Sequence, residues 1–537
     1  MTDKPVVLMP EDIQRIIGKD AQRNNIMAAK MVADIVKTTL GPRGMDKMLV
    51  SPTNDIIVTN DGVTILEEMQ IEHPAAKMMV EIAKTQEAEA GDGTTTAVMM
   101  AGKLLENAEK LLDMKIHPTV ITKGYRMAAE RSSQIMKDIA LRVTPEDSDV
   151  LRQIAMTAMT GKGAEDSKEL FADIILRAVR QIQTNGKIDL KDIKIEKIKG
   201  DGINDTELIS GIVLDKEKVS PDMPSFVRDA KIALLDFPLE IKNPEIQTRI
   251  SITSPEQLQG FLAQEERVIR DIVEKIKISG ANAVFCQKGI DDFAQYLLSK
   301  EEIYACRRIS RSDMEKLAKA TGGKIVSSLN ELTPFELGNA RIVEEKRHGD
   351  DVFTYVRECQ NPKALTILIH GGTSHVIDEI ERAINDGLGD VACTLRSGLV
   401  VPGGGAFEME LAKQLRDFAQ GLSGREQLAV EEFANALEFI PLTLAENAGI
   451  DPIDTLTELK SRHDAGERNA GLNLFTNRIE NVLEARIIEP LKVKSQAISS
   501  ATEVAIMILR IDDVIAASGK KRGMNSVNPL KGMSDEF

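Results

Sequence analysis

Apolar residues recur at helical spacing over long parts of the chain. Between residues 20 and 40 they mark one side of a helix that ends near Gly41 and Pro42. KMLV and IIVT follow as two short strand candidates joined by SPTND. From Ala97 helical spacing resumes, with apolar residues at Val98, Ala101, Leu104, Leu105, Ala108, Leu111 and Leu112. The pattern predicts a largely helical region that extends to about residue 180.

The pattern changes between about residues 230 and 370. Short β-type runs (KIALLDF, NAVFCQ, KIVSS and ALTILI) alternate there with helical segments such as RSDMEKLAKA. Such alternation is typical of an α/β layer domain. Helical spacing returns after residue 375 and continues to about residue 460. We therefore predict a multidomain α+β protein in which a smaller α/β region is inserted into a helical body.

One segment of this region predicts a long amphipathic helix. It opens with a capping box, in which Ser254 is the N-cap, Pro255 is N1 and Gln257 is N3. Because charged residues occupy its other sides, we expect the helix to project from its domain, although an ordinary surface helix is an alternative. Its apolar positions follow alternating steps of four and three, interrupted once by Glu265: Leu258, Leu262, Ile269, Ile272 and Ile276.

Composition narrows the classes of function. The 537 residues suggest about three domains. Asp and Glu outnumber Lys and Arg by 84 to 68, and the net charge of −16 argues against a nucleic-acid partner. The four cysteines are far apart and form no CxxC pair, so we expect a reduced, cytoplasmic protein without zinc. No membrane-length apolar run occurs, and residues 521–537 are predicted to form a mobile tail.

The strongest candidate for chemistry is the stretch GDGTTT, residues 91–96, because it stands at the entry to a helix. Unpaired backbone N–H groups and the helix dipole make such an entry favourable for an anion. The three threonine hydroxyls can donate to phosphate oxygens, whereas Asp92 would repel a phosphate unless a cation lay between them. The stretch therefore suggests a nucleotide with Mg²⁺. A Gly-Asp-Gly turn with an ordinary threonine N-cap is the alternative.

Two common nucleotide-binding motifs are absent from the sequence. Gly163 follows Lys162 where a Walker A loop needs Ser or Thr, and neither GxG pair is completed to GxGxxG. Besides GDGTTT, the candidates for nucleotide binding are short, scattered segments, each of which could also be a helix cap, a turn or a flexible link. They are Leu40-Gly41-Pro42, Asn60-Asp61-Gly62, Thr160–Gly163, Asp386, Gly403–Gly405 and Gly471–Asn473.

In their order and spacing, these segments resemble the group II chaperonins, the family of the archaeal thermosome and the eukaryotic cytosolic TCP-1/CCT subunits. The similarity covers essentially the whole chain, from TTLGPRGMDKMLV through EAGDGTTT and FCQKGIDD to GREQLAVEEFANALEFIP and ILRIDDVI. The resemblance implies an ATP-dependent chaperone that hydrolyses ATP with Mg²⁺. It also implies a stacked double ring of identical or paralogous subunits that encloses non-native polypeptides, with a built-in lid instead of a separate co-chaperonin.

The same resemblance implies three domains, each with defined boundaries. They are an equatorial ATPase domain (1–144 and 402–520), an intermediate hinge domain (145–213 and 367–401) and an apical domain (214–366) with a helical lid protrusion at about 242–276.

The resemblance further implies a nucleotide site assembled from distant residues. Asp386, Asp61 and Lys162 would be the catalytic residues, with Asp386 moving over the pocket to orient the attacking water when the intermediate domain closes. Asp92 would hold Mg²⁺. The nucleotide would contact Leu40, Gly41, Pro42, Gly91, Asp92, Gly93, Thr94, Thr95, Thr96, Gly161, Gly404, Gly405, Asn473 and Glu489.

Asp386 matters most among these residues, and the sequence allows a second interpretation of it. Helical spacing turns it away from the apolar face of its own helix, so a solvated surface acid is the alternative. Gly387 and Gly389 depart from the family pattern and predict a looser helix with altered ATPase timing. A small-molecule kinase or ligase and a non-catalytic helical scaffold stay open as other functions.

Overall fold

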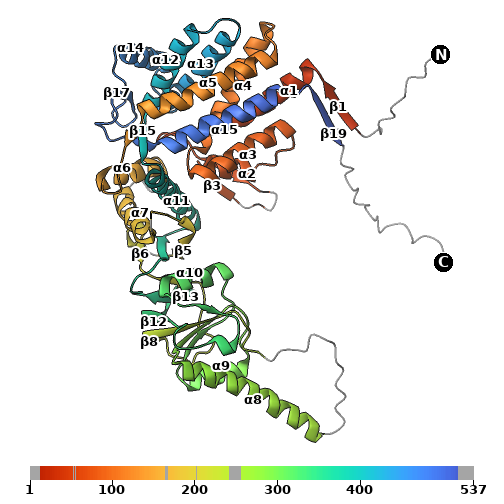
Figure 1. Ribbon diagram of the computed structural model, residues 1–537, viewed down its shortest axis with the longest axis vertical. Helices are drawn as coiled ribbons and strands as arrows, with labels where there is room; N and C mark the ends of the chain where they lie inside the picture. The colour runs from red at the N-terminus through yellow and green to blue at the C-terminus, as the bar shows by residue number, and fades with distance from the viewer. Residues whose placement is uncertain are drawn as a thin grey trace, which may run out of the picture.

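A computed structural model describes residues 13–517 except 52–53, 55, 164–166, 185, 201 and 241–254. Figure 1 shows an elongated molecule with a helical end, a smaller middle part, and a sheet-based end from which one helix extends. Ser254 and the predicted tail 521–537 lie outside the described residues. No described helix is long and apolar enough to cross a membrane.

The helical end is built from both halves of the chain. Its central helix is α4, whose Val98, Leu104 and Leu105 are fully buried in one large core with Phe433 of α13 and Ala501 of α15. The predicted helices are confirmed, although α4 starts three residues before Ala97. The helices are α1 (Lys19–Lys37), α2 (Gly62–Glu68), α3 (Pro74–Ala90), α4 (Thr94–Asp113), α5 (Pro118–Ile139), α12 (Ala406–Gln420), α13 (Glu426–Asn447), α14 (Pro452–Asp464) and α15 (Leu491–Leu509).

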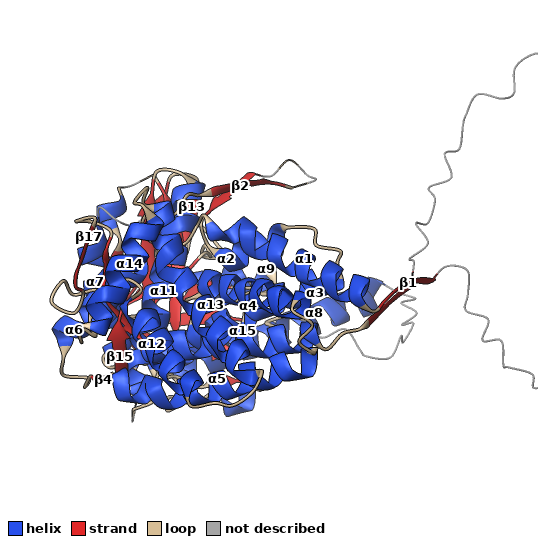
Figure 2. Cartoon of the chain, turned by 90° about the horizontal axis from the view of Figure 1, so that it is seen from above, coloured by secondary structure: helices blue, strands red, loops and turns tan. Residues whose placement is uncertain are grey.

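The helical end also contains several short strands. The predicted pair KMLV and IIVT is confirmed as an antiparallel hairpin of β2 (Lys47–Val50) and β3 (Ile56–Thr59). The strand β1 (Ile13–Ile17) pairs antiparallel with β19 (Asp513–Ala517), and Figure 2 shows this ribbon leaving the helices at one edge. The remaining strands are β16 (Ala470–Asn473) with β17 (Arg478–Asn481), and β15 (Leu399–Pro402) between β18 (Ile488–Pro490) and β4 (Leu141–Arg142).

The middle part packs three helices against a small sheet. The long helix α11 (Ser374–Ser397) lies against α6 (Ser148–Met159) and α7 (Lys168–Ile182), and Phe171, Ile175 and Ile380 are buried between them. In the sheet, β14 (Leu365–Gly371) pairs parallel with β5 (Ile193–Lys199) and antiparallel with β6 (Glu207–Ile209). The run ALTILI is therefore a strand as predicted, but its placement in the inserted α/β region was wrong.

The sheet-based end confirms the predicted α/β alternation. The inward half of α8 (Pro255–Ser279) buries Ile269, Val273 and Ile276 against the sheet, while its N-terminal half extends beyond the sheet in Figure 1. The other helices are α9 (Asp292–Lys300) and α10 (Arg311–Thr321). In spatial order the strands are β10 (Tyr304–Cys306), β9 (Ala283–Cys286), β8 (Phe226–Leu235), β12 (Gly338–His348), β13 (Asp351–Arg357) and β7 (Ile212–Leu214), with β11 (Ile325–Val326) beside β8.

Candidate nucleotide site

A cavity of about 220 Å³ lies where the helical end meets the middle part. Most of the predicted site residues line it, although they come from positions up to 449 residues apart in the sequence, from Leu40 to Glu489. Gly91, Asp386 and Asn473 do not line the cavity itself. The predicted residues in its wall are Leu40, Gly41, Pro42, Asp61, Asp92, Gly93, Thr94, Thr95, Thr96, Gly161, Lys162, Gly404, Gly405 and Glu489.

The loop between α3 and α4 supplies the helix entry that the sequence predicted. Gly91 caps α3 in the left-handed conformation (φ 79°), and Gly93 precedes α4 in the same conformation. The Gln86 side chain donates to the Asp92 carbonyl oxygen at 2.7 Å and fixes the loop. The first turn of α4, with its three threonines, therefore faces the cavity with backbone N–H groups that have no partner within the helix.

Asp61 is held beside this loop by the start of α2. Its Oδ2 accepts hydrogen bonds from the backbone N–H of Thr64 at 2.8 Å and from the Thr64 hydroxyl at 2.7 Å. The Thr94 hydroxyl lies 3.4 Å from its Oδ1. The neighbouring Asn60 side chain donates to the Gly161 carbonyl oxygen at 3.1 Å. The residues that follow the β2–β3 hairpin thus connect the loop between α3 and α4 to the turn that carries Lys162.

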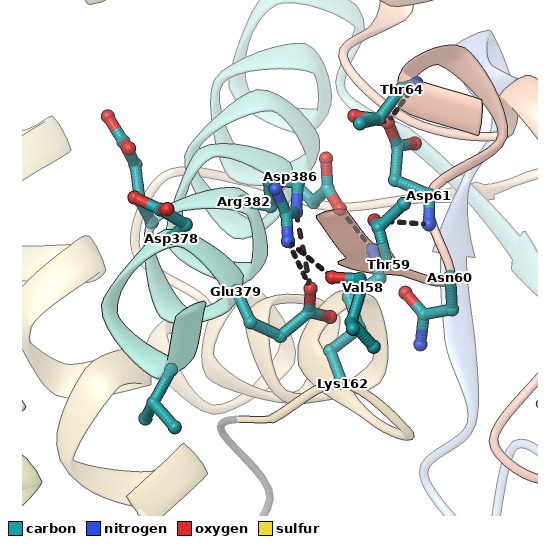
Figure 3. A network of polar contacts seen from close by, with 12 residues as sticks. Val58, Thr59, Asn60, Asp61, Thr64, Lys162, Asp378, Glu379, Arg382 and Asp386 are labelled. Atoms are coloured by element: carbon teal, nitrogen blue, oxygen red, sulfur yellow. Dashed lines mark hydrogen bonds and ion pairs between the residues drawn. The ribbon is translucent and has the colours of Figure 1, made fainter. Parts of the chain in front are cut away.

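Asp386 is buried beside Lys162, so the alternative of a solvated surface acid was wrong. The two side chains form an ion pair (Figure 3). The Lys162 Nζ also lies 4.0 Å from Asp92 Oδ1. Only 7% of Asp386 is exposed, and this burial raises its pKa while the Lys162 charge opposes the rise. The apolar spacing of the helix did not predict this burial, because α11 packs on more than one side. Its polar side faces the loop between α3 and α4.

Arg382 fixes the same helix to the hairpin. One turn before Asp386, its guanidinium lies 2.7 Å from Glu379 Oε2 and donates to the Val58 carbonyl oxygen at 3.3 Å (Figure 3). Val58 belongs to β3, three residues before Asp61. The contact between Arg382 and Val58 therefore helps to position Asp386 relative to Asp61.

The two glycines after Asp386 lie within the helix, and one of them allows a close contact. Helix α11 is continuous through both of them. A Cβ on Gly389 would lie 3.0 Å from the Gly91 Cα, so the absence of a side chain lets α11 touch the loop. A Cβ on Gly387 would come closest to the end of the Ile175 side chain, with Met159 and Ala155 at ordinary contact distance. Gly389 thus allows close approach of two backbones, and the looser helix with altered ATPase timing stays a prediction.

Much of the cavity wall is apolar. Gly404 (φ 60°) approaches the Leu472 carbonyl oxygen so closely that a Cβ would lie 2.7 Å from it. Asn473 points elsewhere: its amide donates to Glu480, and its Oδ1 accepts from the Phe475 N–H at 2.9 Å. It therefore fixes the turn that brings Phe475 to the cavity. The apolar wall consists of Ile440, Leu444, Leu472, Leu474, Phe475, Ile487, Val493 and Ala497.

Several residues in the wall were missed by sequence reasoning. Asp390 lies four residues after Asp386, and this i, i+4 spacing on one helix was a usable signal. Lys494 is buried, with its Nζ 2.9 Å from Glu408 Oε1 and 2.6 Å from Glu489 Oε2. The carboxylates of Glu408 and Glu489 hold the pKa of Lys494 above its ordinary value despite burial, which acts in the opposite direction. Nothing in local sequence indicated this ion-paired group.

The site is rich in carboxylates that crowd one another. Burial, together with the charges of Asp61 and Asp92, raises the pKa of Glu87 to about 7. Within the described ranges, no three His, Cys, Asp or Glu side chains are close enough to hold a metal ion by themselves. The Asp92 carboxylate, which faces the cavity, suits Mg²⁺, an ion that often takes one or two carboxylates and completes its shell with phosphate oxygens and water.

Comparison with known proteins shows the family of the chain. The model of the TCP-1/cpn60 chaperonin family matches residues 32–519, and the chain therefore belongs to this family. It is an ATP-dependent chaperonin subunit and hence an ATPase.

Its similarity to thermosome subunits extends over nearly the whole length. The chain is 57% identical over 518 residues to a thermosome subunit of Methanopyrus kandleri, covering 96% of this chain and 95% of the relative. It is 55% identical over 524 residues to one of Methanocaldococcus jannaschii, covering 97% of each. It is 53% identical over 522 residues to thermosome subunit alpha of Archaeoglobus fulgidus, covering 96% of each. These relatives confirm the predicted family and the α+β fold class.

Proposed function

We propose that the cavity binds ATP with Mg²⁺, and that hydrolysis drives closure of a chaperonin cage. The observation that carries this proposal is one cavity whose wall combines polar and apolar groups. The polar groups are the threonine-rich start of α4 with Asp61, Asp92 and Lys162. Helix N-termini and hydroxyls suit a triphosphate, whereas the apolar wall suits a base.

Four charged residues at or beside the cavity have a role in this proposal. Asp92 holds Mg²⁺, which when bound neutralises phosphate charge. Lys162 places an ammonium beside the terminal phosphate. Asp61 and Asp386 orient the attacking water, and Asp386 accepts its proton. Phosphoryl transfer depends mainly on positioning and charge neutralisation, so two carboxylates and one ammonium supply what the reaction requires.

The proposal assigns mechanical roles to the three parts of the chain. The helical end corresponds to an equatorial domain (1–144 and 402–520), the middle part to an intermediate hinge (145–213 and 367–401), and the sheet-based end to an apical domain (214–366). The separate buried cores of these parts support this division. Because α11 carries Asp386 from the middle part, hinge closure would complete the catalytic site.

We further propose the assembly and its partners. Subunits, of one or more types, form a stacked double ring that encloses non-native polypeptides in the cytoplasm. The region at about 242–276 acts as the lid without a separate co-chaperonin, and the projecting N-terminal half of α8 supports this role. Relatives named as alpha and beta subunits of the thermosome support an assembly of several chains. The four cysteines are free, as suits a reducing compartment.

Electron microscopy of the purified protein with and without ATP tests this function. We expect double rings that are open without nucleotide and lidded when ATP is hydrolysed. Lone subunits at working concentration, or rings that never close, would contradict the proposal. A small-molecule kinase would give particles of low mass in size-exclusion chromatography.

Replacing Phe475 with alanine should weaken nucleotide binding about tenfold, because an exposed aromatic face in the apolar wall of the cavity would be lost. More than half of the Phe475 side chain is exposed, and Lys168 of α7 lies over its ring, with Nζ 5.1 Å from the centroid. Titration with a fluorescent ATP analogue measures the affinity. Phe335→Ala is the matched control, because Phe335 is 96% exposed and lies outside the cavity wall. Equal affinities for the two variants would remove Phe475 from the site.

A further inference from the structure

Asp390 is a buried acid in the cavity wall without an evident structural role. Only 2% of it is exposed, although it lies on α11 one turn after Asp386. Its Oδ1 is shielded from solvent and has no hydrogen-bond partner among the described residues. A buried carboxylate oxygen without a partner is costly, because no donor or cation replaces the water that it loses.

The backbone contact between α11 and the α3–α4 loop brings Asp390 close to Asp92. Gly389 touches Gly91, and each of these glycines is followed directly by one of the two aspartates. Both carboxyl groups line the same cavity. Burial raises the pKa of Asp390, and the charges of Asp92, Asp386 and Glu489 raise it further.

The cationic side chains of the cavity wall are already engaged with other acids. Lys162 forms its ion pair with Asp386, and its Nζ also lies 4.0 Å from Asp92 Oδ1. Lys494 contacts Glu408 and Glu489. Asp390 and Asp92 are therefore two carboxylates, supplied by two different structural elements, for which the nearby Lys162 ammonium is shared with Asp386. Asp390 Oδ1 itself has no hydrogen-bond partner among the described residues. A divalent cation between the two carboxylates would remove their repulsion and supply the missing partner of Asp390 Oδ1.

We propose that Asp390 is a second protein ligand of the divalent cation, together with Asp92. This inference rests on the proposed function, because phosphate oxygens and water would complete the coordination shell. Two carboxylates plus phosphates agree with the lack of any three-residue metal cluster within the described ranges. Because Asp390 belongs to α11 and Asp92 to the loop before α4, the ion would also connect the middle part to the helical end.

Manganese titration of the assembled protein tests this assignment. Mn²⁺ binding is followed by electron paramagnetic resonance in the presence of a saturating non-hydrolysable ATP analogue. Asp390→Asn should raise the Kd for Mn²⁺ at least about tenfold, since an amide oxygen is a weaker ligand than a carboxylate. Binding of the analogue in EDTA should not weaken. Asp378→Asn is the matched control on the same helix, because Asp378 is more exposed and pairs with Lys197 outside the cavity.

Asp390→Cys separates direct ligation from a structural effect. A thiolate favours a soft cation, so this variant should bind Mn²⁺ more weakly and Cd²⁺ more tightly than the unmodified protein. An Mn²⁺ affinity in Asp390→Asn within twofold of normal would overturn the inference, as would an unchanged Cd²⁺ preference in Asp390→Cys. If the unmodified protein bound no ATP analogue at all, the proposed function itself would fail.

Discussion

Replacing Asp386 with alanine should lower the rate of ATP turnover about a hundredfold or more while nucleotide still binds. Asp386 stands outside the cavity wall, so it contributes little to holding the nucleotide. Its carboxylate is nevertheless buried and paired with Lys162, which lines the cavity. The loss should therefore appear in the turnover number at saturating ATP and not in the affinity.

Steady-state phosphate release and equilibrium nucleotide binding measure the two quantities. Glu381→Ala is a suitable control, because Glu381 lies on the same helix and contacts Lys197 away from the site. Asp386→Asn keeps the size of the side chain and tests whether the charge is what matters. Turnover that is undiminished in the alanine variant would remove Asp386 from the catalytic residues.

Replacing Gly389 with valine should reduce ATP turnover by at least about tenfold, and up to about a hundredfold if Asp386 moves by an ångström. A Cβ at this position would lie 3.0 Å from the Gly91 Cα, so one of the two backbones must move. Any such movement displaces α11, which carries Asp386, from the loop that carries Asp92. Nucleotide affinity should fall as well, since the loop lines the cavity.

Gly387→Ala is the matched control for this glycine. Its new Cβ would be too close to one atom, the terminal Cδ1 of Ile175 at 2.7 Å, and a flexible side-chain end can shift. Alanine also favours the helix by up to about 1 kcal/mol. Turnover should therefore stay within a few-fold of normal. If both variants hydrolysed ATP equally well, close contact between Gly389 and Gly91 would not matter for catalysis.

Local patterns in the sequence predicted the elements well, because the features that define them are local. Helical spacing found α1 and α4, and the GDGTTT stretch marked the true entry of a helix beside the cavity. The sequence pattern of a strand does not indicate which other strand it pairs with. The run ALTILI reads as part of the neighbouring α/β region, whereas β14 pairs with β5, more than 160 residues earlier.

The site itself depends on contacts that local patterns cannot contain. The burial of Asp386 results from Lys162, a residue 224 positions away. The role of Gly389 depends on Gly91, a glycine in a different part of the molecule. Helix propensity alone predicts a looser helix at Gly389 and gives no sign of this contact between two backbones. Family resemblance supplied the candidate residues across these distances. It did not supply Asp390, whose proximity to Asp92 becomes visible only when α11 and the loop are placed together.

The pairing of β1 with β19 has a practical consequence for engineering the chain. Ile13 is the direct ladder partner of Ala517, so the first and last described residues stand side by side at the edge of the helical end. A short linker could join these positions and allow the polypeptide to be circularly permuted. A permutant opened in the sheet-based end would encode the helical end as one uninterrupted stretch, which could then be expressed alone.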